Sequence, residues 1–248
     1  MQGVGQAFGN MAVCCQRMGH FEKAMPLYQQ SRAIAEVMGN QPLVAITSSS
    51  LGACHTHLRE YDKAITCYTR QYEIARELEL KEMVPSAALG VGVAMRLWIQ
   101  SDRTGPGNAD GCLCDAQKWL ETAGDCGWII AQYHLALLAF GAGQEDKALC
   151  HLREYLSLCV QEPLKTCTGC HRVRGEHVAM LICSGCSVAK FCNADHKKMA
   201  SNSVASGGGL SHGRHQDICA LLGKWKKVVK DGVPPESCAA DLLAFLQR

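Results

Sequence analysis

Six cysteines and two of the histidines between residues 167 and 219 occur in four closely spaced pairs. Two pairs have the spacing C-x2-C, one has C-x3-H and one has H-x3-C. A gap of two residues forms a tight knuckle and a gap of three spans one helical turn, so each pair can converge on one metal ion. Four pairs supply the eight ligands that two closed tetrahedral Zn²⁺ sites require. These candidate ligands are Cys167, Cys170, Cys183, Cys186, Cys192, His196, His215 and Cys219.

Coordination by four protein ligands leaves no open position for a water molecule, which disfavours hydrolytic zinc chemistry. A segment of about 50 residues with few large apolar side chains also cannot build an adequate core. Metal ligation would supply the missing folding free energy, on the order of 10 kcal/mol or more for a structural site. We therefore expect two structural Zn²⁺ ions as cofactors and no enzymatic activity.

The full pattern is C-x2-C-x12-C-x2-C-x5-C-x3-H-x18-H-x3-C, with Phe191 directly before the fifth ligand. This pattern resembles the MYND zinc finger over residues 167–219. The resemblance implies that the ligand pairs alternate between two metals in a cross-brace. One zinc would then be held by Cys167, Cys170, Cys192 and His196. The other would be held by Cys183, Cys186, His215 and Cys219.

Two positions of the finger depart from the family pattern. Many MYND fingers have a Gln after the sixth ligand and a Trp three residues before the seventh, and these help to bind proline-rich peptides. Lys197 and His212 occupy those positions here, so they are the candidate partner-binding residues of the finger. The insertion at 201–209 is rich in Gly and Ser and predicts a flexible loop. Whether the finger binds proline-rich peptides therefore stays open.

The N-terminal part of the chain, 1–160, predicts helices that repeat at a fixed period. The triplet Phe21, Ala24 and Tyr28 recurs with the same internal spacing as Tyr61, Ala64 and Tyr68, and the interval between the two triplets is the repeat period. A third match follows at Ala148, Leu152 and Tyr155. Small residues precede each match where two helices must approach closely, namely Ala12, Gly52 and Ala136.

This pattern resembles the tetratricopeptide repeat (TPR), in which two antiparallel helices form one unit. One such hairpin cannot bury its apolar face alone, so neighbours stack into a solenoid with a concave surface. About four helix pairs are expected over 1–160. One pair is irregular, because a loop at 101–111 separates a helix at 85–100 from one that resumes at Leu113. This insertion is either a recognition loop or a surface insertion that is tolerated without a function.

A TPR groove commonly binds an extended peptide or a partner helix. The groove-facing candidates are Gln6, Asn10, Val13, Arg17, Ile46, Ser49, Ser50 and Ala53. In one class of TPR proteins, Lys, Asn and Arg side chains grip a C-terminal carboxylate. Here only Asn10 and Arg17 fit that clamp, so they are candidate partner-binding residues but carboxylate capture is not expected.

The sequence thus predicts a mainly α protein with three parts. A TPR-like solenoid at 1–160 precedes the two-zinc finger at 167–219, and a helical extension follows at 220–248. Within the extension we expect a basic helix at 220–230, a break at Pro234 and Pro235, and a short helix at 237–247.

The chain has 25 Lys/Arg and 23 Asp/Glu, so no global field favours nucleic acid or a membrane. The charge is uneven, because residues 165–231 hold eleven Lys/Arg and four Asp/Glu, a net +7. The remainder holds fourteen against nineteen, a net −5. The zinc segment is therefore a basic module attached to a mildly acidic body.

Sixteen cysteines would also suit a secreted disulfide scaffold, but Met1–Asn10 has neither a basic start nor an apolar signal core. Thiolates on zinc need a reducing compartment, so we expect an intracellular protein of the cytoplasm, the nucleus or both. The best apolar run, 128–142, is short for a bilayer and contains Gln132 and His134. No membrane partner is expected, and the oligomeric state is left open.

The module types predict an adaptor without catalytic activity, whose solenoid and zinc finger each bind a partner protein or peptide. A nucleic-acid-associated regulatory protein is the alternative, since the basic module offers lysines for phosphate contacts. Its aromatics for base stacking are sparse, chiefly Phe191 and Trp225, which disfavours this alternative. MYND fingers also occur in SET-domain methyltransferases, but the chain has no strand-rich region and no Asn-His-Ser-Cys stretch. A methyltransferase is therefore the least favoured function.

Overall fold

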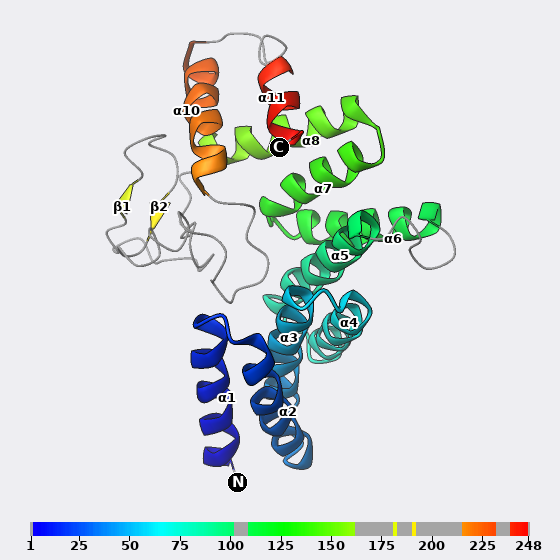
Figure 1. Cartoon of the computed structure of the whole chain (residues 1–248), viewed down its shortest axis with the longest axis vertical. Coiled ribbons are helices and arrows are strands. Elements are labelled where there is room, and N and C mark those ends of the chain that lie inside the picture. The colour runs from blue at the N-terminus through cyan, green and yellow to red at the C-terminus, as the bar shows by residue number, and fades with distance from the viewer. Residues whose placement is uncertain are drawn as a thin grey trace. The chain divides into compact units, whose positions relative to one another are not determined.

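The computed structural model describes residues 2–101, 109–161, 181–182, 190–191, 215–231 and 239–247. The described chain is mainly helical, which confirms the mainly α prediction. It divides into two compact units between Ala131 and Gln132 (Figure 1). The contact pattern thus groups the fourth helix pair with the C-terminal region. The domain boundary expected near residue 160 stays a prediction.

Three helical hairpins form the first unit, and each helix packs on the next one in the chain. The helices are α1 (Gln2–Arg17), α2 (Phe21–Val37), α3 (Gln41–His57), α4 (Tyr61–Glu77), α5 (Met83–Ser101) and α6 (Ala109–Asp125). The bounds of α4 are those of α2 shifted by one repeat period, so the period seen in the sequence is a period of the structure. The TPR-like arrangement of the N-terminal helices is therefore as expected.

Sharp turns with left-handed backbone conformations join these helices. Gly19 and Gly39 have φ values of 81° and 66° in the turns after α1 and α2. The equivalent turns after α3 and α4 place Arg59 at φ 61° and Glu79 at φ 53°. A residue with a Cβ atom is strained in this region, whereas glycine is not. The second repeat therefore carries strain that the first avoids.

Replacement of Arg59 by glycine is expected to raise the free energy of unfolding by about 0.5–1 kcal/mol. The gain is smaller than the full left-handed penalty because glycine also makes the unfolded chain more flexible. Urea denaturation followed by circular dichroism measures the change. Arg59→Ala is the matched control, since it removes the same side chain and keeps the Cβ atom. A glycine variant no more stable than the alanine variant would contradict the strain.

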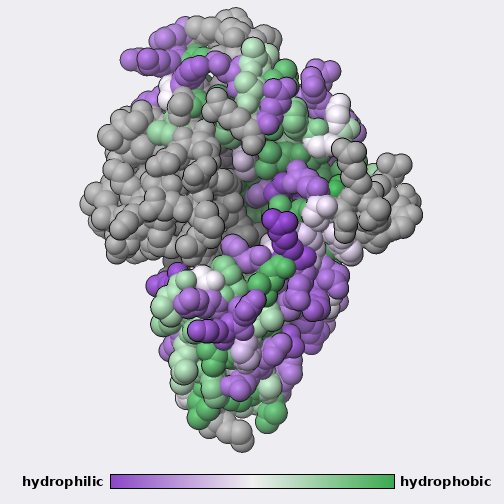
Figure 2. All heavy atoms as spheres, in the orientation of Figure 1, coloured by the Kyte–Doolittle hydropathy of each residue, from purple (hydrophilic) through white to green (hydrophobic). Residues whose placement is uncertain are grey.

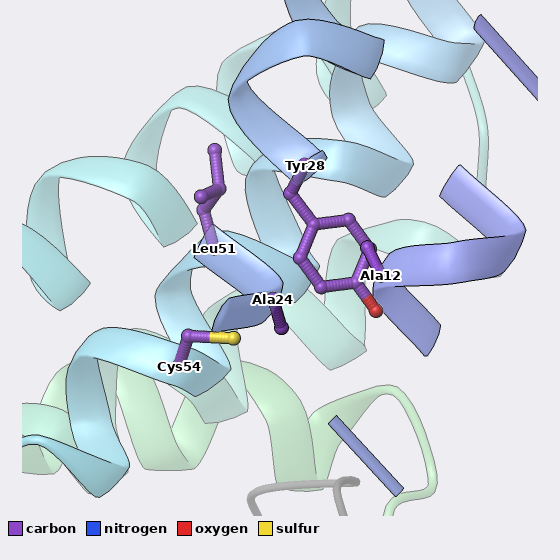
Figure 3. Packing of buried hydrophobic residues seen from close by; sticks show 5 residues of the cluster. All are labelled: Ala12, Ala24, Tyr28, Leu51 and Cys54. Carbon is purple, nitrogen blue, oxygen red and sulfur yellow. The ribbon is translucent and has the colours of Figure 1, made fainter. Parts of the chain in front are cut away.

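The core of the first unit includes the small and aromatic residues of the repeat pattern, together with aliphatic side chains such as Leu51 and Ile74. Figure 3 shows the cluster of Ala12, Ala24, Tyr28, Leu51 and Cys54, which joins α1, α2 and α3. All five side chains are buried. One hairpin therefore completes its core with residues from the next hairpin, as expected of a solenoid.

Glycines allow first and second helices to approach closely. An added Cβ atom at Gly52 would lie 2.9–3.0 Å from the ring of Tyr68, and one at Gly92 would lie 2.7 Å from Leu120 Cγ. The contact at Gly52 confirms the close approach predicted there, and Gly92 is its equivalent one repeat period later. Gly90, which the repeat pattern did not single out, is tighter still, because a Cβ atom there would lie 2.5 Å from Tyr68 Cδ1. Tyr68 is thus enclosed by glycines from α3 and α5.

The third hairpin differs from its predicted bounds. Helix α5 extends to Ser101 and α6 begins at Ala109. The segment between the two helices is therefore shorter than the loop predicted at 101–111. A single glycine, Gly111, in the first turn costs only about 1 kcal/mol, which the packing of the later turns can offset. Ala116, Leu120 and Ala123 are fully buried and form the inner face of α6.

Helix α5 corrects the expectation about apolar segments. Among the described residues it is the one helix long and apolar enough, by length and composition alone, to cross a membrane. More than half of this stretch is buried, and α5 packs on both α4 and α6. A core helix of a soluble protein passes the same test, so the observation is weak evidence of a membrane span. The shorter segment favoured by the sequence forms α7 (Ile130–Gly141).

The second unit pairs α7 with α8 (Glu145–Gln161), for example through the rings of Tyr133 and Tyr155, and places two C-terminal helices on α8. These are α10 (His215–Asp231) and α11 (Ala239–Leu246). Trp225 of α10 is buried and its Nε1–H donates to Ser157 Oγ of α8 at 3.2 Å. Lys224 Nζ pairs with Asp241 Oδ2 at 2.9 Å, which joins α10 to α11. The C-terminal extension is therefore packed on the fourth hairpin.

The C-terminal helices also differ in length from the prediction. Helix α10 begins at His215 instead of residue 220, so it includes two of the candidate zinc ligands. The sequence-based start was placed after the last ligand, because the earlier residues were assigned to the finger. The only described strands are the two-residue β1 (Leu181–Ile182) and β2 (Lys190–Phe191), which pair antiparallel, with Leu181 opposite Phe191.

Candidate binding surface and metal ligands

The first helices of the two N-terminal hairpins carry the residues expected to meet a partner, and we call this set the first-helix face. Its eight positions on α1 and α3 are Gln6, Asn10, Val13, Arg17, Ile46, Ser49, Ser50 and Ala53. The positions on α1 are all exposed, including the two candidate clamp residues, Asn10 and Arg17. On α3, Ile46 is exposed and Ala53 is buried. The first-helix face is therefore exposed throughout on α1 and only partly exposed on α3.

Buried hydrogen bonds fix α1 on α2 beneath this face. The Tyr28 hydroxyl donates to Gln16 Oε1 at 2.5 Å, and the Ser31 hydroxyl donates to the Gly5 carbonyl at 2.8 Å. Burial raises the pKa of Tyr28 to about 12, so its hydroxyl stays a donor at neutral pH. The repeat pattern did not single out Gln16. Its signal was the expected burial of Tyr28, because a buried hydroxyl requires a hydrogen-bond partner.

An ionic hydrogen-bond network closes the turn between α3 and α4. Glu60 accepts from Lys63 Nζ at 3.0 Å, and its other carboxylate oxygen lies 2.6 Å from His55 Nδ1. The hydrogen bond from Lys63, followed by that from His55, lowers the pKa of Glu60. The turn that holds the left-handed Arg59 is therefore fixed by side chains from both helices.

His57 lies one repeat period after Arg17 and so occupies the equivalent position on the next first helix. Its ring stacks on Phe21 of α2, with ring centroids 4.1 Å apart and an angle of 11° between the planes. The loss of solvation in this contact lowers the pKa of His57 below its ordinary 6.5, although the residue as a whole stays exposed. His57 is therefore neutral at pH 7. Arg17, at the equivalent position on α1, has a guanidinium group, which is a permanent cation.

The lowered pKa of His57 predicts a pH dependence of stability. The folded state favours neutral imidazole, so its contribution is complete above pH 6.5 and is lost as the pH falls through the lower folded-state pKa. We expect His57→Phe, which keeps an aromatic ring on Phe21, to reduce the loss of stability below pH 6.5. Denaturation at several pH values tests this difference. An NMR titration that gave His57 a pKa at or above 6.5 would contradict it.

The structure describes two of the eight candidate zinc ligands, His215 and Cys219. They are four residues apart on α10, so the backbone places them on one side of the helix. The other six lie outside the described residues, as do the partner-binding candidates Lys197 and His212. Those six ligands are Cys167, Cys170, Cys183, Cys186, Cys192 and His196.

Three further cysteines lie close together in the sequence near α6, a spacing that could also hold a metal ion. Cys112, Cys114 and Cys126 lie on or just after α6. Within the described part of the chain, no three His, Cys, Asp or Glu side chains gather closely enough to hold a metal ion. The cysteines of α6 therefore do not form a metal site with other described residues.

Comparison with known families bears on the first two hairpins. A family model for the tetratricopeptide repeat matches residues 3–77. The N-terminal repeats are TPR-like. The match spans α1 to α4 and therefore includes the whole first-helix face. No curated protein matches the chain. TPR repeats generally mediate protein–protein interaction, which is consistent with the predicted adaptor role.

Proposed function

We propose that the chain is a zinc-binding adaptor that joins partner proteins or peptides. One partner binds the first-helix face of the TPR-like repeats, and another binds the zinc module. The proposal rests mainly on the first-helix face, where the aliphatic side chain of Val13 is exposed one helical turn from the polar Asn10 and Arg17 on α1, and Ile46 is exposed on α3. Apolar groups surrounded by polar ones are typical of surfaces that bind proteins.

The electrostatics of this face indicate what the partner carries. Arg17 is permanently charged, while His57, at the equivalent position on α3, has a lowered pKa. A single fixed cation beside aliphatic groups favours a segment with an acidic side chain next to an aliphatic one. We propose such a segment, as an extended peptide or a helix, as the ligand of the first-helix face.

Capture of partners from cell extract with the intact chain, followed by mass spectrometry, tests the adaptor role. Ile46→Arg should weaken binding to the first-helix face by about 30-fold, the usual effect of losing a central apolar contact. Leu78→Arg is the matched control, because Leu78 has a similar exposed fraction, 41% against 48% for Ile46, and lies at the end of α4. Cys183→Ser should lose a different set of partners. Identical partner sets for all variants would contradict the proposal.

The zinc module is part of the same proposal, with two structural Zn²⁺ ions bound by the eight ligands in the alternating MYND arrangement. Thiolate and imidazole are the donors that structural zinc prefers. One observation supports the last ligand pair, because His215 and Cys219 lie four residues apart on α10 and so share one side of that helix.

Nucleic-acid binding is less well supported than protein binding. Trp225, one of the two aromatics considered for base stacking, is buried and donates a hydrogen bond to Ser157. Lys224 is paired with Asp241. Both groups are thereby engaged within the second unit. We further propose that the chain has no catalytic activity of its own and acts inside the cell, where zinc-bound thiolates persist.

A further inference from the structure

Helix α10 belongs to two parts of the second unit at once. Its first turns contain His215 and Cys219, two of the eight candidate zinc ligands. Further along the chain, the same helix packs on α8. The buried residues of α10 among those that the structure describes are Leu221, Leu222 and Trp225. One continuous helix therefore links the proposed zinc module to the fourth hairpin.

The candidate ligands and the contact with α8 lie along one side of α10, which we call the α10 stripe. Its members are His215, Cys219, Leu222 and Trp225, which follow one another at intervals of four, three and three residues. Residues at these intervals are neighbours on one face of a helix. At the end of the stripe, the Trp225 Nε1–H donates to Ser157 Oγ of α8 at 3.2 Å. A rotation of α10 about its axis that displaced the ligands would therefore also displace Trp225 from α8.

The remaining surface of α10 is basic and faces solvent. Its exposed lysines are Lys224, Lys226, Lys227 and Lys230. Figure 2 shows hydrophilic surface where Figure 1 places α10. Lys224 pairs with Asp241 of α11, but both side chains are more than half exposed, and exposed ion pairs contribute little to stability. The α10 stripe therefore does more than the lysines to hold α10 in place.

The length of α10 makes its stability depend on how its first turn is held. The helix has 17 residues, not many more than the ~12–15 below which an isolated helix is marginal in water. The first turn is the costly step in helix formation, because several residues are fixed for one hydrogen bond. His215 and Cys219, bound to one metal ion, would fix that first turn. Ligation at this end therefore stabilises the later turns of α10 as well, including the one that carries Trp225.

We propose that α10 couples zinc binding in the finger to the packing of the fourth hairpin. In the zinc-bound protein, His215 and Cys219 fix the first turns of α10 and thereby hold Trp225 on α8. Without zinc, α10 frays from its N-terminal end, Trp225 leaves α8, and α8 loosens. This inference rests on the two-zinc module proposed above and extends its influence from the finger to the helical repeats.

Amide hydrogen exchange of the full-length chain, followed by mass spectrometry, tests the coupling. Exchange is compared before and after a strong chelator removes zinc, and the zinc content of both samples is measured. We expect peptides from 150–159 of α8 and 221–230 of α10 to exchange at least ~10-fold faster without zinc, because both helices then open locally. A peptide from 61–77 of α4 should exchange at an unchanged rate, since α4 belongs to the first unit.

Two cysteine variants separate the loss of zinc from an effect of the chelator. Cys183→Ser removes a proposed ligand of the site that contains His215 and Cys219, and it leaves the sequence of α10 unchanged. It should speed exchange in α8 and α10 as the chelator does. Cys114→Ser is the matched control, since Cys114 is an exposed cysteine of α6. It should exchange like the parent chain.

Coupling between two sites is reciprocal, so a weaker contact with α8 should also weaken zinc binding. Trp225→Phe keeps an aromatic ring but removes the Nε1–H that donates to Ser157. We expect it to lower the zinc affinity about 3-fold, measured by competition with a chromophoric chelator. Trp119→Phe is the matched control, because Trp119 lies on α6 and its ring contacts Tyr72 of α4. It should bind zinc as the parent does.

The outcomes distinguish this inference from the zinc module on which it rests. A parent chain with two zinc ions whose α8 exchanges equally fast after chelation would overturn the coupling and leave the zinc module standing. Equal zinc affinity of Trp225→Phe and the parent would count against the coupling in the same way. Faster exchange in α4 as well as α8 would indicate unfolding of the whole chain and contradict a route through α10. A parent chain without zinc would overturn the zinc module and the coupling together.

Discussion

Replacement of Gly90 by alanine is expected to lower the free energy of unfolding of the first unit by about 1–3 kcal/mol, the usual range for overpacking a core. The new Cβ atom would lie 2.5–2.7 Å from three atoms of the Tyr68 ring. Tyr68 cannot move away, because its ring also faces Gly52 and is buried between α3 and α5. Denaturant titration of the purified chain measures the change.

Gly3→Ala is the matched control for this prediction. Gly3 also lies within a helix, but an added Cβ atom there meets nothing within 4 Å. The control should therefore gain up to ~1 kcal/mol from the better helix propensity of alanine. Adding Tyr68→Leu to Gly90→Ala should recover part of the loss, since the two sites are in contact. If Gly90→Ala were as stable as Gly3→Ala, the close packing of α4 on α5 would be contradicted.

Removal of zinc is expected to have the largest effect on the second unit. A metal-free finger loses folding free energy on the order of 10 kcal/mol per site, so residues 167–219 should unfold when a strong chelator is added. Metal analysis of the purified protein should find two zinc ions per chain. The helical signal of α1 to α6 should survive chelation, because none of the eight ligands lies in those helices.

Single-ligand variants separate the two proposed sites. Cys183→Ser should retain one zinc ion, because the site of Cys167, Cys170, Cys192 and His196 keeps all its ligands. Cys114→Ser is the matched control, since Cys114 is an exposed cysteine of α6 outside the ligand set. It should retain both ions. Metal analysis of the parent that gave zero or one zinc ion per chain would reject the eight-ligand assignment.

The repeat pattern predicted most of the first unit, because residues that recur at a fixed interval indicate helix packing that repeats at the same interval. Ala24, Tyr28 and their equivalents had to be buried wherever two helices of this spacing meet, and they are. The role of Gly90 was not predictable in the same way, since it depends on which neighbour meets α5. The exposure of Met11 was equally unpredictable, because Met11 is an apolar residue at the position equivalent to the buried Leu51.

The sequence predicted the first residues of the helices less well than their buried faces. Gly111 looked like a helix breaker and His215 like part of a loop between ligands, yet each lies at the beginning of a helix. Local signals decide only the first turn of a helix, and packing of the later turns can override them. For the zinc module, the eight candidate ligands stay a prediction from their spacing, and their pairing stays a prediction from the MYND resemblance.

The way each helix of the first unit packs mainly on its neighbours in the chain has a consequence for folding. Contacts between neighbouring segments close only short loops, so the entropy lost before the first favourable contact is small. The repeats should fold rapidly and can nucleate at any hairpin. Under mechanical tension they should come apart one hairpin at a time, so that the array yields gradually and recoils when the force is released.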